Sequence, residues 1–180
     1  ILKKIIVRFF FQIQYWRKIL FHVMQKYLKP NNNNYKLKIR LAKKEDFFFI
    51  LKLHNQNVRK KKFFSKDQVS VKKHKIWYNK KIQEKMLFVA MFKEKIGYIR
   101  YDKINNKYLS ISIAIKNKFK RQGFGKYMMS KTLSKKKILD FNILAKIKSQ
   151  NLISKKFFLN SGFVYYKKDN YILRSKKKIK

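Results

Sequence analysis

Hydrophobic residues near the start of the chain recur at alternating intervals of three and four positions. They are Ile6, Phe9, Ile13, Trp16, Leu20, Val23 and Tyr27. This spacing places them on one face of a helix, while basic residues such as Arg8 and Arg17 fall elsewhere on its surface. We favour packing of this amphipathic helix against the rest of the chain or against a second copy. The alternative is peripheral contact of residues 5–28 with an anionic membrane surface.

A polar segment separates this helix from the rest of the chain. Pro30 and the run from Asn31 to Asn34 do not hold a helix easily, and they interrupt the hydrophobic pattern. The sequence therefore predicts three parts: the helix and linker over residues 1–34, a domain over residues 35–175, and a basic tail over residues 176–180.

Within the domain, the spacing of hydrophobic residues switches between the periods of strands and helices. Strands are predicted over residues 37–41, 86–92, 95–101 and 108–115. Helices are predicted over residues 45–62, 70–81 and 126–133. Asp46 is suited to cap the first of these helices, and Gly97 is suited to ease a bulge in its strand.

The strand predicted over residues 108–115 has two unlike faces, because successive side chains of a strand alternate. One face carries Leu109, Ile111, Ile113 and Ile115. The other carries Ser110, Ser112 and Ala114. Small side chains are ordinary beneath a packed helix, but they also leave room for a narrow ligand to lie against the strand.

A turn that contains two of the chain's four glycines follows this strand. Gly123 and Gly125 fall in the segment 120–126, which opens the next helix. Backbone N–H groups at a helix N-terminus, uncrowded by side chains, form a site for an anion such as a pyrophosphate. A plain helix start is the alternative. The segment is not the dehydrogenase fingerprint, which needs a third glycine, nor a P-loop, because Tyr127 follows Lys126.

The residue composition excludes several kinds of catalytic and structural site. The chain has no cysteine, which excludes a disulfide framework and a cysteine nucleophile. Its 8 acidic residues form no ligand cluster with its 3 histidines, so we expect no metal. No apolar run reaches the roughly 20 residues that span a bilayer, and no signal peptide is evident, so we expect a cytoplasmic protein. The start at Ile1 is consistent with a fragment.

The formal net charge of +41 suggests binding to nucleic acid. The basic residues are mostly lysines spread along the chain, and they accompany an excess of Ile, Asn, Phe and Tyr. All these residue types have codons rich in A and T, so an AT-rich genome accounts for the charge. We therefore expect no specific nucleic-acid partner, although nonspecific adhesion to polyanions follows from the charge alone.

The strand end and the glycine turn together resemble the CoA-binding motif of the GNAT superfamily of N-acetyltransferases, Arg/Gln-x-x-Gly-x-Gly/Ala. The residues that carry the resemblance are Ile113, Ala114, Ile115, Lys120, Arg121, Gln122, Gly123, Phe124, Gly125 and Lys126. Lys120 stands at the Arg/Gln position, and Arg121 replaces a frequent glycine. Downstream, the family's closing strand, helix and Gly-Phe signature are resembled by Leu144-Ala145-Lys146-Ile147, then Asn151, Ser154, Phe157 and Phe158, and then Gly162-Phe163.

This resemblance implies an α/β (α+β) fold, with a central mixed, mostly antiparallel sheet flanked by helices and the N-terminal helix as an addition. It implies that acetyl-CoA binds the ten residues just given together with Asn151 and Phe158, and that no metal takes part. It also implies direct transfer, in which a neutral amine attacks the thioester. A backbone N–H of Ile113, Ala114 or Ile115 then binds the oxyanion.

The N-terminal half of the domain is similar to the nucleotide-linked aminosugar N-acetyltransferases of pseudaminic-acid and related surface-glycan pathways. The matching segments are Leu53-His54-Asn55, Val58-Arg59, Val69-Ser70, His74, Trp77-Tyr78 and residues 96–101. The likeness implies contacts with the acceptor from Asn55, Arg59, His74, Trp77 and Arg100. Helix capping, a solvated face or a strand-edge charge are the alternatives for several of them. Ribosomal-protein and other N-terminal acetyltransferases share much of this layout, so a peptide amine is the alternative acceptor.

Proton transfer is the part of the chemistry with the fewest matching residues. His74 is the candidate base, since an unperturbed histidine has a pKa of about 6.5, and a surface histidine is the alternative. Many relatives place a glutamate on the central strand, whereas this strand has no carboxylate. Phe158 stands where relatives often have the tyrosine that protonates the departing thiolate. The alternatives are that water, Tyr165 or Tyr166 replaces it, or that the reaction needs no acid.

Overall fold

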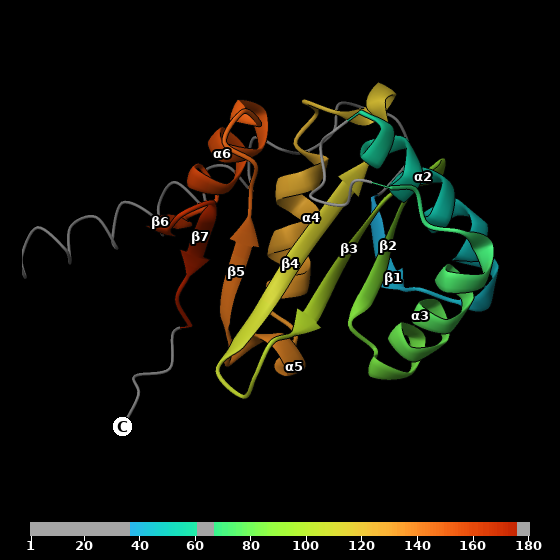
Figure 1. Cartoon of the computed structure of the whole chain (residues 1–180), viewed down its shortest axis with the longest axis horizontal. Coiled ribbons are helices and arrows are strands. Elements are labelled where there is room, and N and C mark those ends of the chain that lie inside the picture. Colours follow the sequence, from blue (N-terminus) through green and yellow to red (C-terminus); the bar gives the residue numbers. More distant parts are fainter. Residues whose placement is uncertain (1–36, 61–66, 176–180) are drawn as a thin grey trace, which may run out of the picture. The chain divides into compact units, whose positions relative to one another are not determined.

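A computed structural model describes residues 37–60 and 67–175 of the chain (Figure 1). The helix and linker predicted over residues 1–34 and the tail predicted over residues 176–180 lie outside these ranges. Within them, no helix is long and apolar enough to cross a membrane.

The strands of the described residues form a single sheet. They are β1 (Lys38–Leu41), β2 (Leu87–Phe92), β3 (Glu94–Lys103), β4 (Tyr108–Ile115), β5 (Asn142–Lys146), β6 (Val164–Lys167) and β7 (Asn170–Leu173). Their order across the sheet is β1-β2-β3-β4-β5-β7-β6. Neighbouring strands are antiparallel, except that β4 and β5 are parallel. The mixed, mostly antiparallel sheet implied by the family resemblance is therefore confirmed.

Helices pack on both faces of this sheet (Figure 1). They are α2 (Phe47–Arg59), α3 (Val71–Glu84), α4 (Phe124–Leu133), α5 (Lys136–Leu139) and α6 (Leu152–Leu159). The first three of these agree to within three residues with the helices that the sequence predicts. The short α5 and the hairpin of β6 and β7 are not predicted by hydrophobic spacing, because four-residue elements are too short to display a period.

The strand β4 separates two hydrophobic cores. Ile111 belongs to the larger core together with Met128 of α4, whereas Ala114 belongs to the smaller core together with Leu53 of α2. This division follows from the two-residue period of a strand, in which successive side chains point to opposite faces. The small residues of β4, including Ser112, therefore lie on the face toward α2 and α3. We call it the α2–α3 face.

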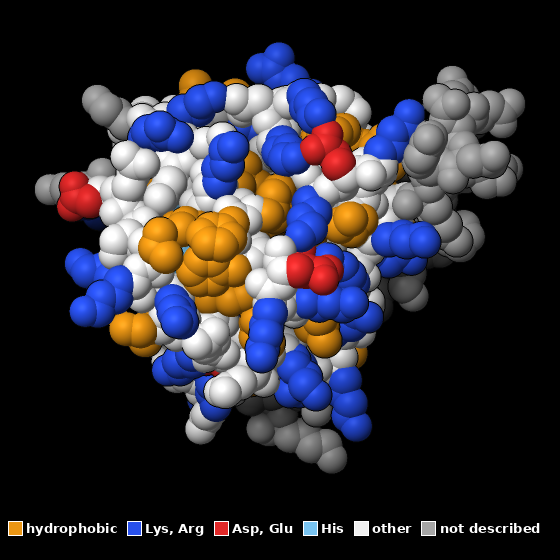
Figure 2. Space-filling view, turned by 90° about the vertical axis from the view of Figure 1, so that its right-hand side faces the viewer, with side chains coloured by type: hydrophobic (Ala, Val, Ile, Leu, Met, Phe, Trp, Pro, Cys, Tyr) orange, Lys and Arg blue, Asp and Glu red, His pale blue; other side chains and the backbone are white. Residues whose placement is uncertain are grey.

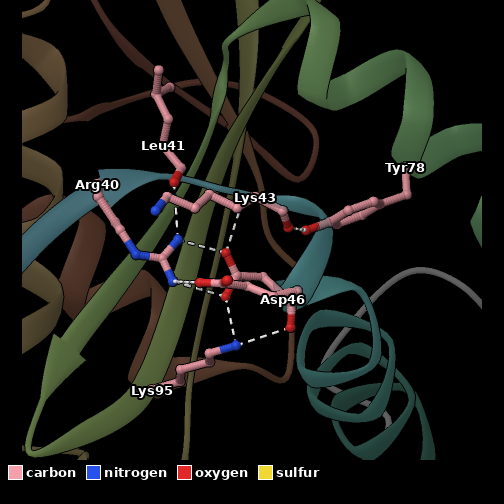
Figure 3. A network of polar contacts seen from close by, with 7 residues as sticks. Arg40, Leu41, Lys43, Asp46, Tyr78 and Lys95 are labelled. Carbon is pink, nitrogen blue, oxygen red and sulfur yellow. Dashed lines mark hydrogen bonds and ion pairs between the residues drawn. The ribbon is translucent and has the colours of Figure 1, made fainter.

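A buried carboxylate fixes the start of α2 against the sheet (Figure 3). Asp46 is fully buried, and its two oxygens lie 2.6 and 3.0 Å from the guanidinium nitrogens of Arg40 in β1. Its Oδ1 lies 2.7 Å from Nζ of Lys95 in β3, and its Oδ2 accepts a 2.8 Å hydrogen bond from the N–H of Lys43. Burial alone would raise the pKa of Asp46, but these donors outweigh it and lower the pKa to about 2.

The prediction that Asp46 caps α2 is wrong in its detail. Its side chain accepts no hydrogen bond from the first turn of α2. It closes the preceding 3-10 turn, η1 (Lys44–Asp46), through the N–H of Lys43. The physical reason is that two charged donors from the sheet compete for the same oxygens, and charge-assisted bonds are stronger than a neutral cap.

Gly97 lies beside an irregularity in the sheet, which confirms the predicted bulge. The register of β2 and β3 shifts between Ala90 and Met91, next to the pair of Ala90 with Gly97. A Cβ at Gly97 would lie only 2.5 Å from the carbonyl oxygen of Ala114 in β4. The missing side chain therefore also lets β4 approach β3 closely.

Candidate active site

The strands β4 and β5 pair over only part of their length. Their register begins with Tyr108 beside Asn142 and ends with Ser110 beside Leu144, whereas β4 continues to Ile115. The two strands diverge beyond this point (Figure 1). Within the described ranges, residues 111–115 therefore have no strand partner on the β5 side. We call this gap the β4–β5 opening.

The hydrogen-bond pattern decides which N–H groups of β4 face the β4–β5 opening. Just past the end of β4, the N–H of Lys116 donates to the carbonyl of Ile96 at 2.8 Å. Hydrogen bonding alternates along an antiparallel pair, so the N–H of Ala114 also turns toward β3. Those of Ile113 and Ile115 turn toward β5. Of the three backbone donors that the sequence leaves open, Ile113 and Ile115 are available to a ligand in the opening, and Ala114 is not.

The turn between β4 and α4 has the backbone geometry of an anion site. Gly123, directly before α4, has a φ of 78°, which glycine adopts without strain. Arg121 has a φ of 62°, a conformation that costs a residue with a side chain about 1–2 kcal/mol. Gln122 braces the turn by donating to the carbonyl of Lys118 at 2.8 Å. The 10-residue α4 thus begins with N–H groups that no large side chain at Gly123 obscures.

A second glycine brings α4 against the open end of β4. A Cβ at Gly125 would lie 3.1 Å from the ring of Phe157 and 3.3 Å from Cδ1 of Ile115. Phe124 packs beside it against Phe92, with ring centroids 5.1 Å apart. The first turn of α4 therefore lies beside the residue that carries one of the open N–H groups of β4.

Basic side chains surround this turn. Lys116 and Lys118 both form ion pairs with Glu94, the acidic residue at the start of β3. Three further cations belong to the turn and to the start of α4: Lys120, Arg121 and Lys126. Their charges add to the partial positive charge of the helix N-terminus, so the turn suits a polyphosphate.

Two residues that the resemblance associates with the cofactor lie on or next to α6. Asn151 precedes this helix, and its Oδ1 accepts a 3.2 Å hydrogen bond from the N–H of Ser154. Its capping role is therefore confirmed, and its contact with the cofactor stays a prediction. Phe158 is only 6% exposed and belongs to the larger core. Phe157, which the sequence does not single out for this role, is the aromatic residue that lies against Gly125.

Polar side chains gather on the α2–α3 face beside the open end of β4. The register pairs Tyr98 with Ala114 and Arg100 with Ser112, so all four residues share that face. The guanidinium carbon of Arg100 lies 5.0 Å from the ring centroid of Trp77 in α3. Two residues predicted for the acceptor site thus lie together, and such stacking favours a fixed orientation of the guanidinium. Their contact with an acceptor stays a prediction.

A carboxylate on this face is committed to ion pairs. Asp102 of β3 lies 3.2 Å from Nε of Arg100 and 2.6 Å from Nζ of Lys81 in α3. Lys81 is 7% exposed and also binds Glu84. Burial would lower the pKa of Lys81, but its bonds to both carboxylates raise it. Asp102 is therefore held in ion pairs with both cations.

Two histidines approach the α2–α3 face from different helices. His54 of α2 is half-buried, and its Nδ1 lies 3.3 Å from the hydroxyl oxygen of Tyr98. Burial and the charges of Arg100 and His74 lower the pKa of His54 to about 4. His74 of α3 is only 3% exposed, with its ring 4.7 Å from that of Phe47. Burial also lowers its pKa, against a hydrogen bond to the backbone of Phe47.

The remaining predicted acceptor contacts lie on α2. Both groups of the Asn55 amide bond to the backbone of Val69, where Nδ2 donates at 2.9 Å and Oδ1 accepts at 2.9 Å. Asn55 therefore holds the segment before α3 against α2. Arg59 is exposed at the last residue of α2, next to residues 61–66, which lie outside the described ranges. Contacts of both residues with an acceptor stay predictions.

The contact of His54 with Tyr98 and the ion pair of Lys81 with Asp102 were not predicted from the sequence. A partial signal was present, because the period of two from Arg100 places Tyr98 and Asp102 on its face. The spacing of residues along the chain does not show that α2 and α3 pack against that face.

The segment that matches a known protein family contains all of these features. Residues 39–163 match the model of the acetyltransferase (GNAT) family. The chain belongs to the GNAT family. The matched segment contains the β4–β5 opening, the glycine turn and the α2–α3 face, so the resemblance drawn from the motif is confirmed. The protein is thus an acyltransferase that uses acetyl-CoA as the acetyl donor.

Solved structures share this GNAT fold at low sequence identity. The protein yncA of Salmonella typhimurium, solved with its cofactor acetyl-CoA, is 16% identical, with a TM-score of 0.67 over 81% of this chain and 97% of that one. A phosphinothricin acetyltransferase of Sinorhizobium meliloti in complex with acetyl-CoA is 16% identical, with a TM-score of 0.66 over 76% and 85%. A spermidine N-acetyltransferase of Vibrio cholerae with CoA and spermine is 20% identical, with a TM-score of 0.63 over 76% and 91%. No curated protein matches the chain.

The residues of the site fit acetyl-CoA. The N–H groups of Ile113 and Ile115 face an opening that lacks a strand, and they can bind the amide and carbonyl oxygens of an extended ligand. Gly123 and the start of α4 suit its diphosphate. GNAT enzymes need no metal, and the described part of the chain has no group of three His, Asp or Glu residues that could hold one.

Proposed function

We propose that this GNAT enzyme transfers the acetyl group to the 4-amino group of a nucleotide-linked deoxyaminosugar. The likeness of residues 53–59 and 96–101 to enzymes of surface-glycan pathways supports this acceptor class. The observation that carries it is Arg100, whose guanidinium lies over Trp77 on the α2–α3 face. A guanidinium held in this way is suited to bidentate contact with a phosphate. Binding of a polyamine would instead require carboxylates that form no ion pair within the protein. Asp102 already forms one with Lys81.

Backbone groups carry the stabilisation of the transition state in this proposal. Acetyl-CoA supplies an acyl carbon that is activated as a thioester. One of the N–H groups of Ile113 and Ile115 donates to the acyl oxygen as negative charge develops on it, and the other, about 7 Å away along the strand, is left for another oxygen of the donor. Because both donors belong to the main chain, the rate depends on the position of β4 more than on the side chains of these two residues.

Proton transfer needs a base for the amine and a proton donor for the thiolate, and few side chains of the site are suited to either role. A hexose amine near neutral pH is partly unprotonated, so it needs only modest help from a base. His74, the base favoured by the sequence, lies buried beneath the rings of Phe47 and Trp77. Tyr165 and Tyr166 of β6 are exposed. A thiol with a pKa of about 8.5 is a fair leaving group, so we assign protonation of the thiolate to water.

The face of the molecule in Figure 2 does not favour a specific nucleic-acid function. Figure 2 shows one face of the molecule, on which Lys and Arg side chains are scattered around a central patch of hydrophobic side chains. The exposed hydrophobic residues of α2 and α3 include Phe48, Val71 and Ile76. A nucleic-acid interface would instead gather its positive charge along one stripe or groove.

Binding of the donor is tested first, by calorimetric titration of acetyl-CoA at moderate salt. Gly123→Ala places a side chain at a φ of 78° in the glycine turn, and Gly162→Ala places one at a φ of 92° in the turn after α6. The two variants carry similar backbone strain, so only the position differs. We expect saturable binding in the wild type and in Gly162→Ala, and at least tenfold weaker binding in Gly123→Ala. Equal, salt-sensitive binding in all three would contradict the site.

The acceptor is tested by thiol release with three amines: a UDP-linked 4-amino-4,6-dideoxyhexose, a peptide with an N-terminal alanine, and spermidine. We expect the highest kcat/KM for the sugar nucleotide. Arg100→Gln should lower kcat/KM for the sugar nucleotide about tenfold or more, since a charged hydrogen bond is worth about 1.5–3 kcal/mol. It should leave turnover of the peptide nearly unchanged. Preference for the peptide would favour an N-terminal acetyltransferase instead.

A further inference from the structure

The α2–α3 face is the side of the sheet from which an amine can approach the β4–β5 opening. On the other face, Ile115 packs against the larger core, and the first turn of α4 lies against it. A Cβ at Gly125 would be 3.3 Å from Ile115 and 3.1 Å from the ring of Phe157. The glycine turn that suits the diphosphate of the donor precedes the same helix. The amine therefore meets the side chains of β3 and β4 that point toward α2 and α3.

Most polar side chains that β3 places on this face are unsuited to accept a hydrogen bond from the amine. A neutral amine that attacks with its lone pair keeps only N–H donors, so its partner must be an acceptor. Arg100 has no acceptor atom, and Asp102 is held in ion pairs with Arg100 and Lys81. The Tyr98 side chain is only 1% exposed, and its hydroxyl oxygen lies 3.3 Å from the ring of His54. The hydroxyl groups of β4 remain.

The pairing of β4 with β5 distinguishes the hydroxyl groups that β4 places on this face. Ser110 stands opposite Leu144 in the last pair of the two strands, and Tyr108 precedes it on the same face. Ser112 is the next residue on this face, past the end of the pairing. It directly precedes Ile113, whose N–H turns toward the opening. Of the hydroxyl groups of β4, that of Ser112 therefore lies nearest to the backbone donors that would bind the acyl oxygen.

The hydroxyl of Ser112 is available to a ligand. The residue is half-buried, and its hydroxyl forms no hydrogen bond with another described residue. Nor is it among the side-chain polar atoms in that part of the chain that are enclosed without a partner. The same holds for Ser110, which is also half-buried. The two serines thus differ in their place relative to the opening and are alike in burial and bonding.

We propose that the hydroxyl oxygen of Ser112 accepts a hydrogen bond from an N–H of the acceptor amine and so holds its lone pair toward the acyl carbon. The inference rests on the proposed transfer to an amine at this site. The nitrogen bonds to the acyl carbon, and the carbon–sulfur bond breaks with its electron pair remaining on sulfur. The nitrogen releases its proton to water, and the thiolate takes one from water. Because the nitrogen gains positive charge as it bonds to carbon, its hydrogen bond to Ser112 is strongest in the transition state.

The first test compares Ser112→Ala with Ser110→Ala, a matched control on the same face of the same strand. The assay uses the amine that gives the fastest turnover in the acceptor assay. We expect Ser112→Ala to lower kcat about tenfold or more, because a hydrogen bond to a charged group is lost. Ser110→Ala should stay within about twofold of the wild type. Calorimetric affinity for acetyl-CoA should be unchanged in both variants, because the donor contacts proposed at β4 are backbone N–H groups.

A second pair of variants separates the hydroxyl from the volume of the side chain. Threonine and valine are alike in shape and both favour strands, so Ser112→Thr and Ser112→Val differ chiefly in the hydroxyl. We expect kcat of Ser112→Thr to exceed that of Ser112→Val about tenfold. A role in packing would give the two variants the same rate.

Three results would overturn the inference while leaving the proposed function intact: kcat of Ser112→Ala within about twofold of the wild type, an equal loss in Ser110→Ala, or equal rates for Ser112→Thr and Ser112→Val. Weaker acetyl-CoA binding in Ser112→Ala would also count against it, since that indicates a displaced β4. If the peptide is the best acceptor, the proposed acceptor class fails, and the serine variants still decide the inference. If the wild-type protein binds acetyl-CoA but acetylates no amine, the proposed function fails, and the inference fails with it.

Discussion

Replacing Asp46 with asparagine removes the negative charge at the centre of the network in Figure 3 while keeping the shape of the side chain. Arg40 and Lys95 then face a neutral amide in place of the carboxylate that they now contact at 2.6 and 2.7 Å. Both cations have side chains that are less than one third exposed. Removing one partner of such a network leaves charges that water solvates poorly, so the change should destabilise the folded state.

The magnitude follows from the pKa of Asp46. Its carboxyl has a pKa near 3.8 when unperturbed and about 2 in the folded protein, which corresponds to about 2 kcal/mol at 1.36 kcal/mol per unit. Poor solvation of Arg40 and Lys95 adds to this loss. We therefore expect Asp46→Asn to lower the free energy of unfolding by about 2–4 kcal/mol at pH 7.

The sign of the pH dependence is fixed by the direction of the shift. The folded pKa lies below the unfolded one, so the stabilisation is complete above about pH 4 and is lost as the pH falls toward 2. Urea unfolding at pH 7 and pH 3 measures this, with Asp67→Asn as a control that removes an exposed charge. The gap between wild type and Asp46→Asn should narrow by about 1 kcal/mol at pH 3. A loss below about 0.5 kcal/mol at pH 7, or a gap independent of pH, would refute the reasoning.

Three further substitutions test other contacts by urea unfolding. Gly97→Ala puts a Cβ 2.5 Å from the carbonyl oxygen of Ala114, so it should cost about 1–3 kcal/mol and weaken acetyl-CoA binding; unchanged binding would show that β4 does not move. Arg121→Gly should raise stability by about 0.5–1 kcal/mol, because it relieves a φ of 62°; a loss would contradict this. Tyr101→Phe should cost about 1 kcal/mol, because it removes the 2.8 Å hydrogen bond that the Tyr101 hydroxyl donates to Thr132, whose own hydroxyl still donates within α4. A cost above about 3 kcal/mol would point to a larger role.

The site could be predicted from sequence where its geometry is local. The glycine turn is an example, because Gly123 needs its φ of 78° and the start of α4 supplies N–H groups within the same short segment. Asn151 is another, since a cap involves residues three apart. The contact of His54 with Tyr98 is different, because it joins residues 44 positions apart. No local pattern in the sequence encodes a contact between residues that are so far apart along the chain.

By itself the sequence determined the segments of β1 to β4 and of α2, α3 and α4, because hydrophobic residues repeat with the period of each element. It also determined the two faces of β4 and the position of the glycine turn before α4. Only the tertiary structure decided that β5 leaves β4 after Ser110, that Ile113 and Ile115 face the gap, and that Asp46 bonds to the sheet in preference to its helix. These features depend on which strands become neighbours and in what register, and that is set by the packing of the whole sheet.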